Sequence, residues 1–379
     1  MTSTVIGWWM YELTNSVMAL AFVGLSEVVP ALSLALYAGH YIDKHEKRKL
    51  LIKCVFLYWL CILAFIFLSA PFAADHFNVW TIAILICAVI ACTGAIRSFS
   101  GPGFSSIISQ IVPREILSSA ANITSATFLI ASFIGHILGG FLIAFIGIQN
   151  TFIVVFIVVA IAFFFLTRLK TKPVFITSDK NYWASVKEGL NYVFKTKLYA
   201  LLSLDLFAVL FGGAVAMVPV FSKDILHIGP IGFGWLNAAA DIGSIITVLT
   251  LTVHPLRKNQ GRILFFAVGG FGLALILFAI SKIFWLSFAA LLISGSLDGI
   301  SVIIRSTYLQ LKTPDRLKGR VMSINSMFIN SSNELGQFES GVAAKIMGTV
   351  TSVVFGGLMT LFIAILTWIK SPALRKMEY

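Results

Sequence analysis

The chain alternates between long apolar runs and short polar segments over its whole length. Crossing the hydrocarbon core of a bilayer takes about 20 apolar residues of α-helix, and most runs have about that length. The pattern therefore predicts an all-α integral membrane protein. The predicted helices are Met1–Glu12, Val17–Ala38, Leu51–Ala74, Val79 to about Ser109, Leu117–Ile146, Thr151–Thr167, Leu198–Ser222, Ile231–Val253, Ile263–Ile280, Ile283–Leu311, Val321–Ile346 and Thr351–Ile369.

The first of these runs is too short to span a bilayer, and it leads into Thr14-Asn15-Ser16, which is a turn signal. We expect the first helix to be truncated, through a misassigned start or a real truncation. The N-terminus lacks a basic segment followed by a small-residue cleavage site, so no cleavable signal peptide is expected.

The stretch Arg168–Lys197 is polar by comparison and divides the apolar runs into two sets. This predicts an N-terminal helical half at 1–167, a link at 168–197 and a C-terminal half at 198–379. Within the link, Trp183–Phe194 has an amphipathic pattern typical of a helix that lies along a membrane surface. Its apolar face is expected to consist of Trp183, Val186, Leu190 and Val193.

The two halves show a weak repeat at an offset of 201 residues. It aligns Val112-Pro113-Arg114 with Thr313-Pro314-Asp315, Gly135 with Gly336, and Gly140 with Gly341. The matches fall at loop and helix-packing positions, as in transporters built from parallel repeats. Chance similarity between apolar runs is the alternative.

Composition and charge exclude two classes of protein. Hydrophobic residues make up 58% of the 379 residues and charged residues only 12%, which argues against a soluble globular protein. The net charge of +12 first suggests nucleic-acid binding, but the charges lie in short loops between apolar runs and not on one polar face. The cysteines lie inside apolar runs without metal-ligand spacing, so no metal site is expected.

The basic residues also predict the orientation. Most of the 28 Lys and Arg lie in the loops that follow the even-numbered helices of this prediction, in the link and in the C-terminal tail. Because basic loops stay in the cytoplasm, these segments and the C-terminus are expected to be cytoplasmic. The prediction is a multi-pass protein of the plasma (inner) membrane.

The stretch Gly39–Lys49 carries a family resemblance. Gly39, Asp43, Lys47 and Arg48 match the loop between helices 2 and 3 of the major facilitator superfamily, although Glu46 stands where that family usually has a second Gly. The resemblance implies a conformational-gating loop. Gly39 would let two helices approach closely, and Asp43 would accept hydrogen bonds from a neighbouring helix N-terminus.

Further stretches resemble the exporter branch of this superfamily. Gly135-His136-Ile137-Leu138-Gly139-Gly140 is similar to its helix 5 motif, with His136 in place of a Pro. Leu204–Gly234 and Leu297–Gly341 look like parts of bacterial efflux members, including the enterobactin-exporter-like group. The resemblance implies two six-helix halves, a small-molecule substrate, no cofactor and a monomer. The expected helix-packing glycines are Gly135, Gly139, Gly140, Gly336 and Gly341.

Charged residues inside the spans are the functional candidates, because each is unfavourable in lipid. The repeat offset places Arg97 opposite Asp298, so the two are expected to pair across a cavity. Asp298 is expected to be the main proton or substrate site, with Arg97 or Arg305 as its alternating partner. A structural ion pair is the alternative role for each. The substrate or proton candidates are Glu27, Arg97, Asp205, Asp298, Arg305 and Glu334, while Asp241 and Glu339 are further charges inside spans.

Enzyme chemistry is not expected, since no zinc-protease, nucleophile-elbow, P-loop or paired-cysteine motif occurs. Carboxylates inside spans can bind and release protons, which makes protons the expected coupling ion. The interpretation is a proton-coupled antiporter that exports a small, partly apolar molecule such as a drug or siderophore. The alternatives are an importer or facilitator of a small metabolite, and a membrane sensor or intramembrane enzyme without transport.

Overall fold

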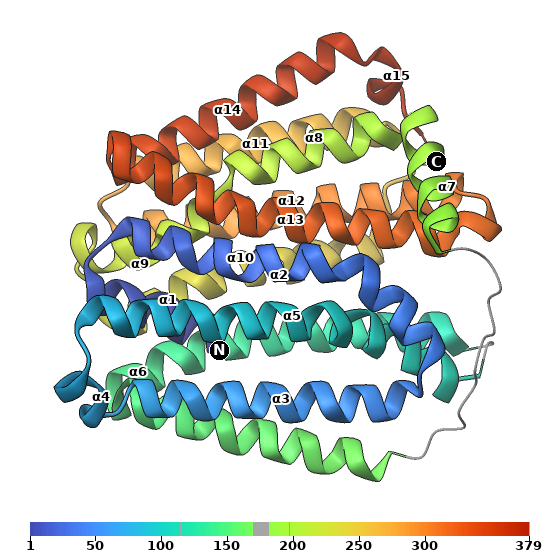
Figure 1. Ribbon diagram of the computed structural model, residues 1–379. Coiled ribbons are helices and arrows are strands. Elements are labelled where there is room, and N and C mark those ends of the chain that lie inside the picture. Colours follow the sequence, from blue (N-terminus) through green and yellow to red (C-terminus); the bar gives the residue numbers. More distant parts are fainter. Residues whose placement is uncertain (114–115, 170–181, 197, 379) are drawn as a thin grey trace. The chain divides into compact units, whose positions relative to one another are not determined.

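The computed structural model describes residues 1–113, 116–169, 182–196 and 198–378; within these ranges a few side chains, that of Asp43 among them, are not described. The secondary structure of these residues is helical (Figure 1). The chain divides into two compact units, Met1–Asp179 and Lys180–Tyr379. Each unit is described separately below.

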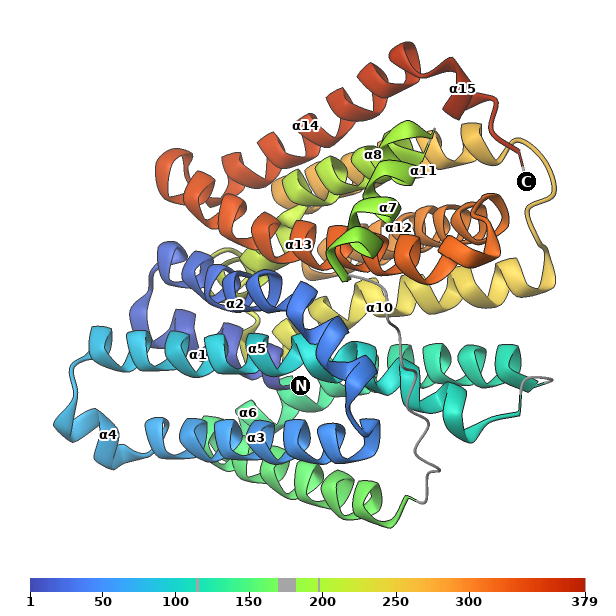
Figure 2. The same ribbon diagram turned by 45° about the vertical axis from the view of Figure 1, so that its right-hand side comes forward.

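The N-terminal unit consists of α1 (Thr2–Thr14), α2 (Val17–Lys44), α3 (Lys47–Leu68), the short α4 (Pro71–His76), α5 (Val79–Ile111) and α6 (Leu117–Arg168). Between α1 and α2, Asn15 adopts the left-handed conformation, with φ 46°, which an asparagine tolerates well. This confirms the turn predicted at Thr14–Ser16. In Figure 2, α3 lies beside α5 and part of α6, the helices that it contacts.

The helix α6 comprises two segments, because Gly147 has a non-helical backbone with φ 78° and ψ 172°. A positive φ of this size suits glycine, which has no Cβ. The break lies in the gap predicted between Ile146 and Thr151. Each segment is long enough to cross a bilayer, so the described part of this unit contains six helical segments beside α4.

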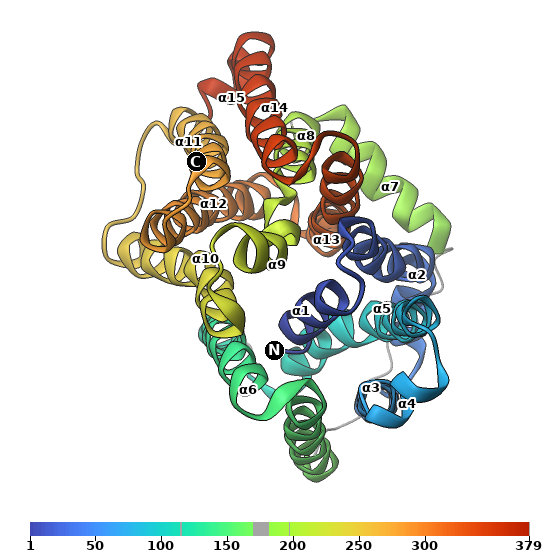
Figure 3. The ribbon, with the colours of Figure 1, turned by 90° about the vertical axis from the view of Figure 1, so that its left-hand side faces the viewer.

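The C-terminal unit begins with α7 (Tyr182–Lys195) and α8 (Leu198–Phe211). Its later helices are α10 (Gly229–Val253), α11 (Gln260–Ile280), α12 (Phe284–Lys312), α13 (Asp315–Met347), α14 (Thr349–Lys370) and the short α15 (Pro372–Arg375). Figure 3 looks along these helices and shows α12 beside α10 and α11, and α8 beside α13 and α14, in agreement with their contacts.

The run predicted as one helix at Leu198–Ser222 is interrupted after α8. A 3-10 turn (Gly213–Met217), one helical turn labelled α9 (Val218–Val220) and a π-helical turn (Phe221–Ile225) follow. The prediction of a continuous helix was wrong here because an apolar run does not reveal a backbone break. At the break, a Cβ on Gly213 would overlap the carbonyl of Gly336, so the absence of a side chain lets α13 approach closely.

Nine helices in the described ranges are long and apolar enough to cross a membrane. Large apolar side chains remain on the surface, such as Phe145 and Phe266, each 74% exposed, as expected where lipid is the solvent. The polar α13 and the short α1 are not among the nine. The all-α membrane fold predicted from the sequence is therefore confirmed.

The apolar face of α7 packs against protein in its C-terminal part, and the predicted position of this helix along the membrane surface stays a prediction. Val193 is 1% exposed and packs against Leu202 of α8 and Val321 of α13. The Tyr192 hydroxyl donates a hydrogen bond to the carbonyl of Lys312 at 2.9 Å, and Glu188 pairs with Arg320. The helix therefore packs across the ends of α12 and α13 (Figures 1 and 2); the side chains of Trp183 and Val186 lie outside the described residues.

Candidate functional site

A buried ion pair joins α8 and α12 in the C-terminal unit. Arg305 pairs with Asp205, and their side chains are only 3% and 9% exposed. Asp205 lies seven residues after Leu198, the first residue of α8. Arg305 lies seven residues before Lys312, the last residue of α12. The two side chains are therefore at equal distances from one end of their helices. In this conformation the described partner of Arg305 is therefore Asp205, and its expected alternation as a partner of Asp298 stays a prediction.

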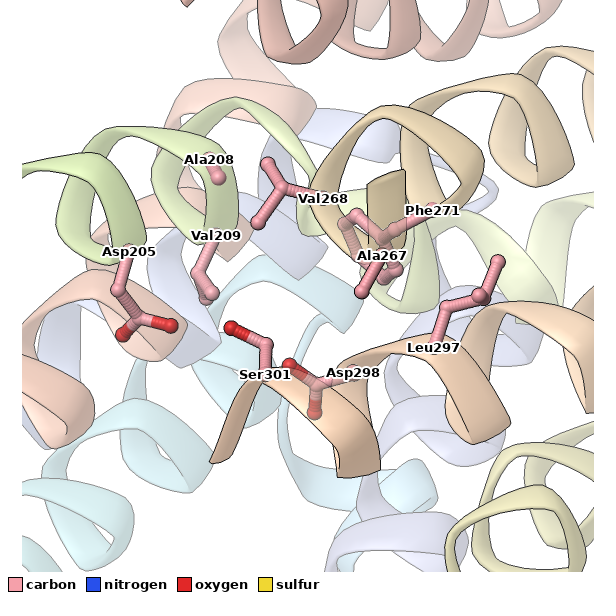
Figure 4. Close-up of a pocket in the computed structure, with 9 residues that line it drawn as sticks. All are labelled: Asp205, Ala208, Val209, Ala267, Val268, Phe271, Leu297, Asp298 and Ser301. Carbon is pink, nitrogen blue, oxygen red and sulfur yellow. The ribbon is translucent and has the colours of Figure 1, made fainter. Parts of the chain in front are cut away.

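Asp298 lies beside this pair. It is at the middle of α12, fourteen residues from both Phe284 and Lys312, and it lines the same small cavity as Asp205. In Figure 4, Ser301 lies between the two carboxylates, while α11 contributes Ala267, Val268 and Phe271. The cavity volume is about 10 Å³, which is room for about one water molecule.

The charges around this cavity do not balance. Asp298 forms no hydrogen bond or ion pair with any residue that the structure describes. The cavity is therefore lined by one carboxylate that pairs with Arg305 and by a second, that of Asp298, without a described cationic partner, and the α11 side chains at the cavity are apolar. The Nε of Arg305 is buried and finds no hydrogen-bond acceptor among the described residues, so this side chain retains a donor for a second acceptor.

A second ion pair lies in the N-terminal unit. The Arg97 Nη1 of α5 is 2.5 Å from the Glu27 Oε1 of α2. The Arg97 side chain is 51% exposed and that of Glu27 is 24% exposed. Arg97 and Asp298 belong to different units, and their expected pairing stays a prediction.

Packing glycines in both units lie against atoms of other helices. In the N-terminal unit, Gly139 of α6 lies against Thr4 of α1, beside a 2.8 Å hydrogen bond between Thr4 Oγ1 and His136 Nδ1. In the C-terminal unit, a Cβ on Gly336 of α13 would lie 2.8 Å from the carbonyl oxygen of Leu210. Gly135, Gly140 and Gly341 are also buried.

The loop between α2 and α3 is only partly described. Lys47 is buried, Gly39 is half-buried, and the side chain of Asp43 lies outside the described residues. Arg48 donates a hydrogen bond from Nη2 to the carbonyl of Thr167 at 2.5 Å. Since Thr167 is in the last turn of α6, a cation is favourable at this helix C-terminus.

The polarity of α13 was missed by the sequence analysis, which considered only its charges. Glu334 is buried and accepts a hydrogen bond from Gln337 Nε2 at 3.1 Å. Ser326, Asn330 and Asn333 are exposed, and their spacing of four and three residues places them on one helix face. That spacing was the signal in the sequence that could have identified a polar face.

Comparisons with known proteins agree with this architecture. A family model described as the Major Facilitator Superfamily matches residues 1–337. Among solved structures, a mutant of the nucleoside transporter NupG has a TM-score of 0.75 at 15% identity, covering 97% of this chain and 94% of that one. The inward-open xylose transporter XylE from E. coli has a TM-score of 0.71 at 10% identity, covering 96% and 91%. These two structures show the fold.

Relatives in sequence carry more specific names. The multidrug efflux pump Tap of Mycolicibacterium fortuitum is 22% identical over 384 residues, covering 98% of this chain and 91% of Tap. The staphyloferrin A transporter of Staphylococcus aureus is 23% identical over 381 residues, covering 98% and 92%. The enterobactin exporter EntS of Escherichia coli is 24% identical over 266 residues, covering 70% of this chain and 64% of EntS.

The matched family model covers most of the chain, and the fold agrees with it. The chain therefore belongs to the major facilitator superfamily, whose members are membrane transporters and not enzymes.

Proposed function

We propose that this secondary transporter exports a small, partly apolar molecule, of the drug or siderophore type, in exchange for protons. Alternating access would expose the substrate site first to the cytoplasm and then to the outside. We place the protein in the plasma membrane with its C-terminus in the cytoplasm. The excess of Lys and Arg in the loops on one side supports this orientation.

One observation carries the coupling to protons: Asp205 and Asp298 line one small cavity inside membrane-spanning helices, and Arg305 pairs with Asp205 but forms no described ion pair with Asp298. A second negative charge without a partner is unfavourable at this depth, and a proton removes it. A cavity of about 10 Å³ is too small for an organic substrate but accommodates a proton carried by water. We therefore assign coupling to this cavity.

The names of the relatives support export. Tap is named as an efflux pump and EntS as an exporter. The staphyloferrin A transporter, which matches over nearly the same length as Tap, supports a substrate of siderophore type. At identities of 22% to 24%, these names indicate a class of substrate and not one compound.

Measurement of compound accumulation tests the proposal. The chain would be expressed in a bacterium that lacks its major efflux pumps, and a panel of fluorescent drugs and radiolabelled siderophores would be offered. We expect lower accumulation of at least one compound, and loss of this effect after a protonophore collapses the proton gradient. The matched control is cells that express the Asp298→Asn variant with the same amount of protein in the membrane.

Three outcomes would contradict the proposal. Higher accumulation would indicate an importer or facilitator. Unchanged accumulation of every compound would indicate a sensor. Export that continues after the proton gradient has collapsed would exclude coupling to protons.

A further inference from the structure

We propose that the C-terminal unit binds an anionic phospholipid at the end where α11 begins and α14 ends. Arg262 and Arg375 bind the headgroup phosphate, and the exposed apolar surface beside them contacts the acyl chains. The inference goes beyond the proposed function. Only the placement of this lipid in the cytoplasmic leaflet rests on the proposed orientation of the chain.

The segment after α14 folds back onto the start of α11 (Figure 2). The amide of Gly261 donates a hydrogen bond to the carbonyl of Met377 at 3.0 Å, and the amide of Asn259 donates one to Glu378 Oε1 at 3.2 Å. A Cβ on Gly261 would overlap the carbonyl oxygen of Leu374. Both Leu374 and Met377 are buried. This C-terminal segment is therefore part of the packed unit, and its charged side chains are attached to a fixed backbone.

This packing gathers basic side chains into one small region. The segments 254–263 and 368–378 contain one carboxylate, that of Glu378, and six Lys or Arg, namely Arg257, Lys258, Arg262, Lys370, Arg375 and Lys376. None of the six forms an ion pair with any residue that the structure describes. Elsewhere in the unit, Arg305 and Arg320 each pair with a carboxylate. Because like charges repel, this region favours binding of an anion from outside the chain.

Two of these arginines border aromatic rings. Phe266 is exposed and lies four residues after Arg262, which places both on one face of α11. The ring centroids of Phe266 and Trp368 are 6.3 Å apart. The Arg375 Cζ lies 5.2 Å from the centroid of Trp368, which is within the range of a cation–π contact. The four side chains therefore form one connected surface of two cations and two rings.

The apolar surface continues from these rings toward the middle of the membrane. On the same face of α11 as Phe266, the next positions are Gly269 and the exposed Leu273. A Cβ on Gly269 would have Leu361 of α14 as its nearest neighbour, at 3.9 Å. Ile365, four residues after Leu361 on α14, is also exposed. A hydrocarbon chain can therefore lie along both helices, with no side chain between Phe266 and Leu273 on this face of α11.

The chemistry of the basic groups identifies the headgroup. A guanidinium presents a planar set of N–H donors that matches a phosphate in two parallel hydrogen bonds. Arg262 is in the first turn of α11, so it lies at the end of a span, where headgroup phosphates are found. Basic residues at the cytoplasmic ends of membrane helices attract anionic lipids. A free phosphate ion offers the same oxygens, but the exposed apolar surface favours a phosphate that carries acyl chains.

Orientation of the chain in the membrane does not account for this arrangement. Basic residues set the orientation by their number in short loops, and this effect does not require a folded segment. Here the buried Leu374 and Met377 hold basic residues of the C-terminal segment against the start of α11. A fixed arrangement of this kind is what recognition of a headgroup requires.

Competition between two lipids tests the inference. The full chain in detergent would be mixed with equal amounts of phosphatidylglycerol and phosphatidylcholine that carry the same acyl chains, and native mass spectrometry would count the lipids retained. We expect phosphatidylglycerol to be retained at least about tenfold more than phosphatidylcholine, since each basic side chain near a membrane surface contributes about fivefold in affinity. Glycerol phosphate at the same concentration should not displace it.

Substitutions locate the site. Arg262→Gln/Arg375→Gln should reduce the preference for phosphatidylglycerol by about tenfold or more, and Arg262→Lys/Arg375→Lys should retain most of it. Lys282→Gln/Lys345→Gln is the matched control, because it removes two exposed cations at the opposite end of the same unit. Arg262→Gln alone should reduce the preference about fivefold. The exposed Arg262 forms no hydrogen bond with a described residue, so this variant should keep the fold.

The inference would be overturned if the wild type retained both lipids equally, or if Arg262→Gln and Arg262→Gln/Arg375→Gln kept the full preference. An equal loss in Lys282→Gln/Lys345→Gln would indicate a general effect of net charge and would also overturn it. Displacement by glycerol phosphate would show a site for a soluble phosphate and not for a lipid. The measurement involves no transport, so its result is independent of the proposed export.

Discussion

Arg305 of α12 and Asp205 of α8 form an ion pair in which both side chains are almost completely buried. Removal of one member leaves the other charge without a partner, which typically costs about 3–5 kcal/mol. We therefore expect Arg305→Gln and Asp205→Asn each to lower the Tm of the purified protein strongly. Thermal unfolding in detergent, followed by intrinsic fluorescence, measures this change.

The double variant Asp205→Asn/Arg305→Gln supplies the control. It leaves no isolated charge at the pair, so its Tm should be higher than the sum of the two single effects predicts. If the Tm decrease of the double variant equalled the sum of the two single decreases, the two side chains would not stabilise each other.

Close approach of α13 to α8 depends on Gly336. A Cβ there would lie 2.8 Å from the carbonyl oxygen of Leu210 and 2.9 Å from that of Val209, and backbone atoms cannot move aside easily. We expect Gly336→Ala to reduce the yield of folded protein and to lower its Tm. Gly101→Ala is the matched control, because a Cβ on Gly101 meets no atom within 4 Å. Equal stability of the two variants would exclude this packing role.

Docking of α7 depends on its apolar contacts more than on its ion pair. Val193 is 1% exposed, so Val193→Asp should lower the Tm and increase proteolysis between the two units. The Glu188–Arg320 pair is partly exposed, at 42% and 27%, and such pairs contribute at most about 1 kcal/mol. Glu188→Gln should therefore have little effect on limited proteolysis. A larger effect of Glu188→Gln than of Val193→Asp would contradict this assignment.

The loop between α2 and α3 is expected to control the conformational cycle. We predict that Asp43→Asn lowers the turnover rate more than the affinity for substrate, because substrates of such transporters bind near the membrane midplane. Transport kinetics give both quantities. Lys49→Gln is a control in the same loop, since Lys49 is 74% exposed and pairs with the nearby Glu46 at 2.8 Å. If Asp43→Asn kept the turnover rate of the wild type but lost affinity for substrate, the prediction would be contradicted.

Sequence periodicity predicted most of the helices, because each apolar run has the length that a bilayer requires. The turn at Gly147 was predicted for the same reason, since the residues around it interrupt the apolar pattern. The break after Phe211 was not predictable in this way, because the apolar run continues through it. The close contact of Gly213 with Gly336 there links residues that are far apart in the chain.

Only part of the candidate site was predictable. The unfavourable energy of charges in lipid selected Asp205, Asp298 and Arg305, which the structure brings to one region. The sequence offered Arg305 as an alternating partner of Asp298, but the pattern within one helix contains no information on α8, which supplies Asp205. For α7, an amphipathic pattern has the same form whether the apolar face meets lipid or protein, and packing decided between them.

The role of Asp298 as the proton site is tested most directly by transport into proteoliposomes. Wild type, Asp298→Asn and the neutral cavity variant Ser301→Ala would be reconstituted at equal density, and flux of a transported compound would be measured under an imposed pH gradient and without one. We predict that the gradient accelerates transport by wild type and Ser301→Ala and has no effect on Asp298→Asn, although that variant folds and inserts normally. Normal acceleration of transport by the pH gradient in Asp298→Asn would contradict the account.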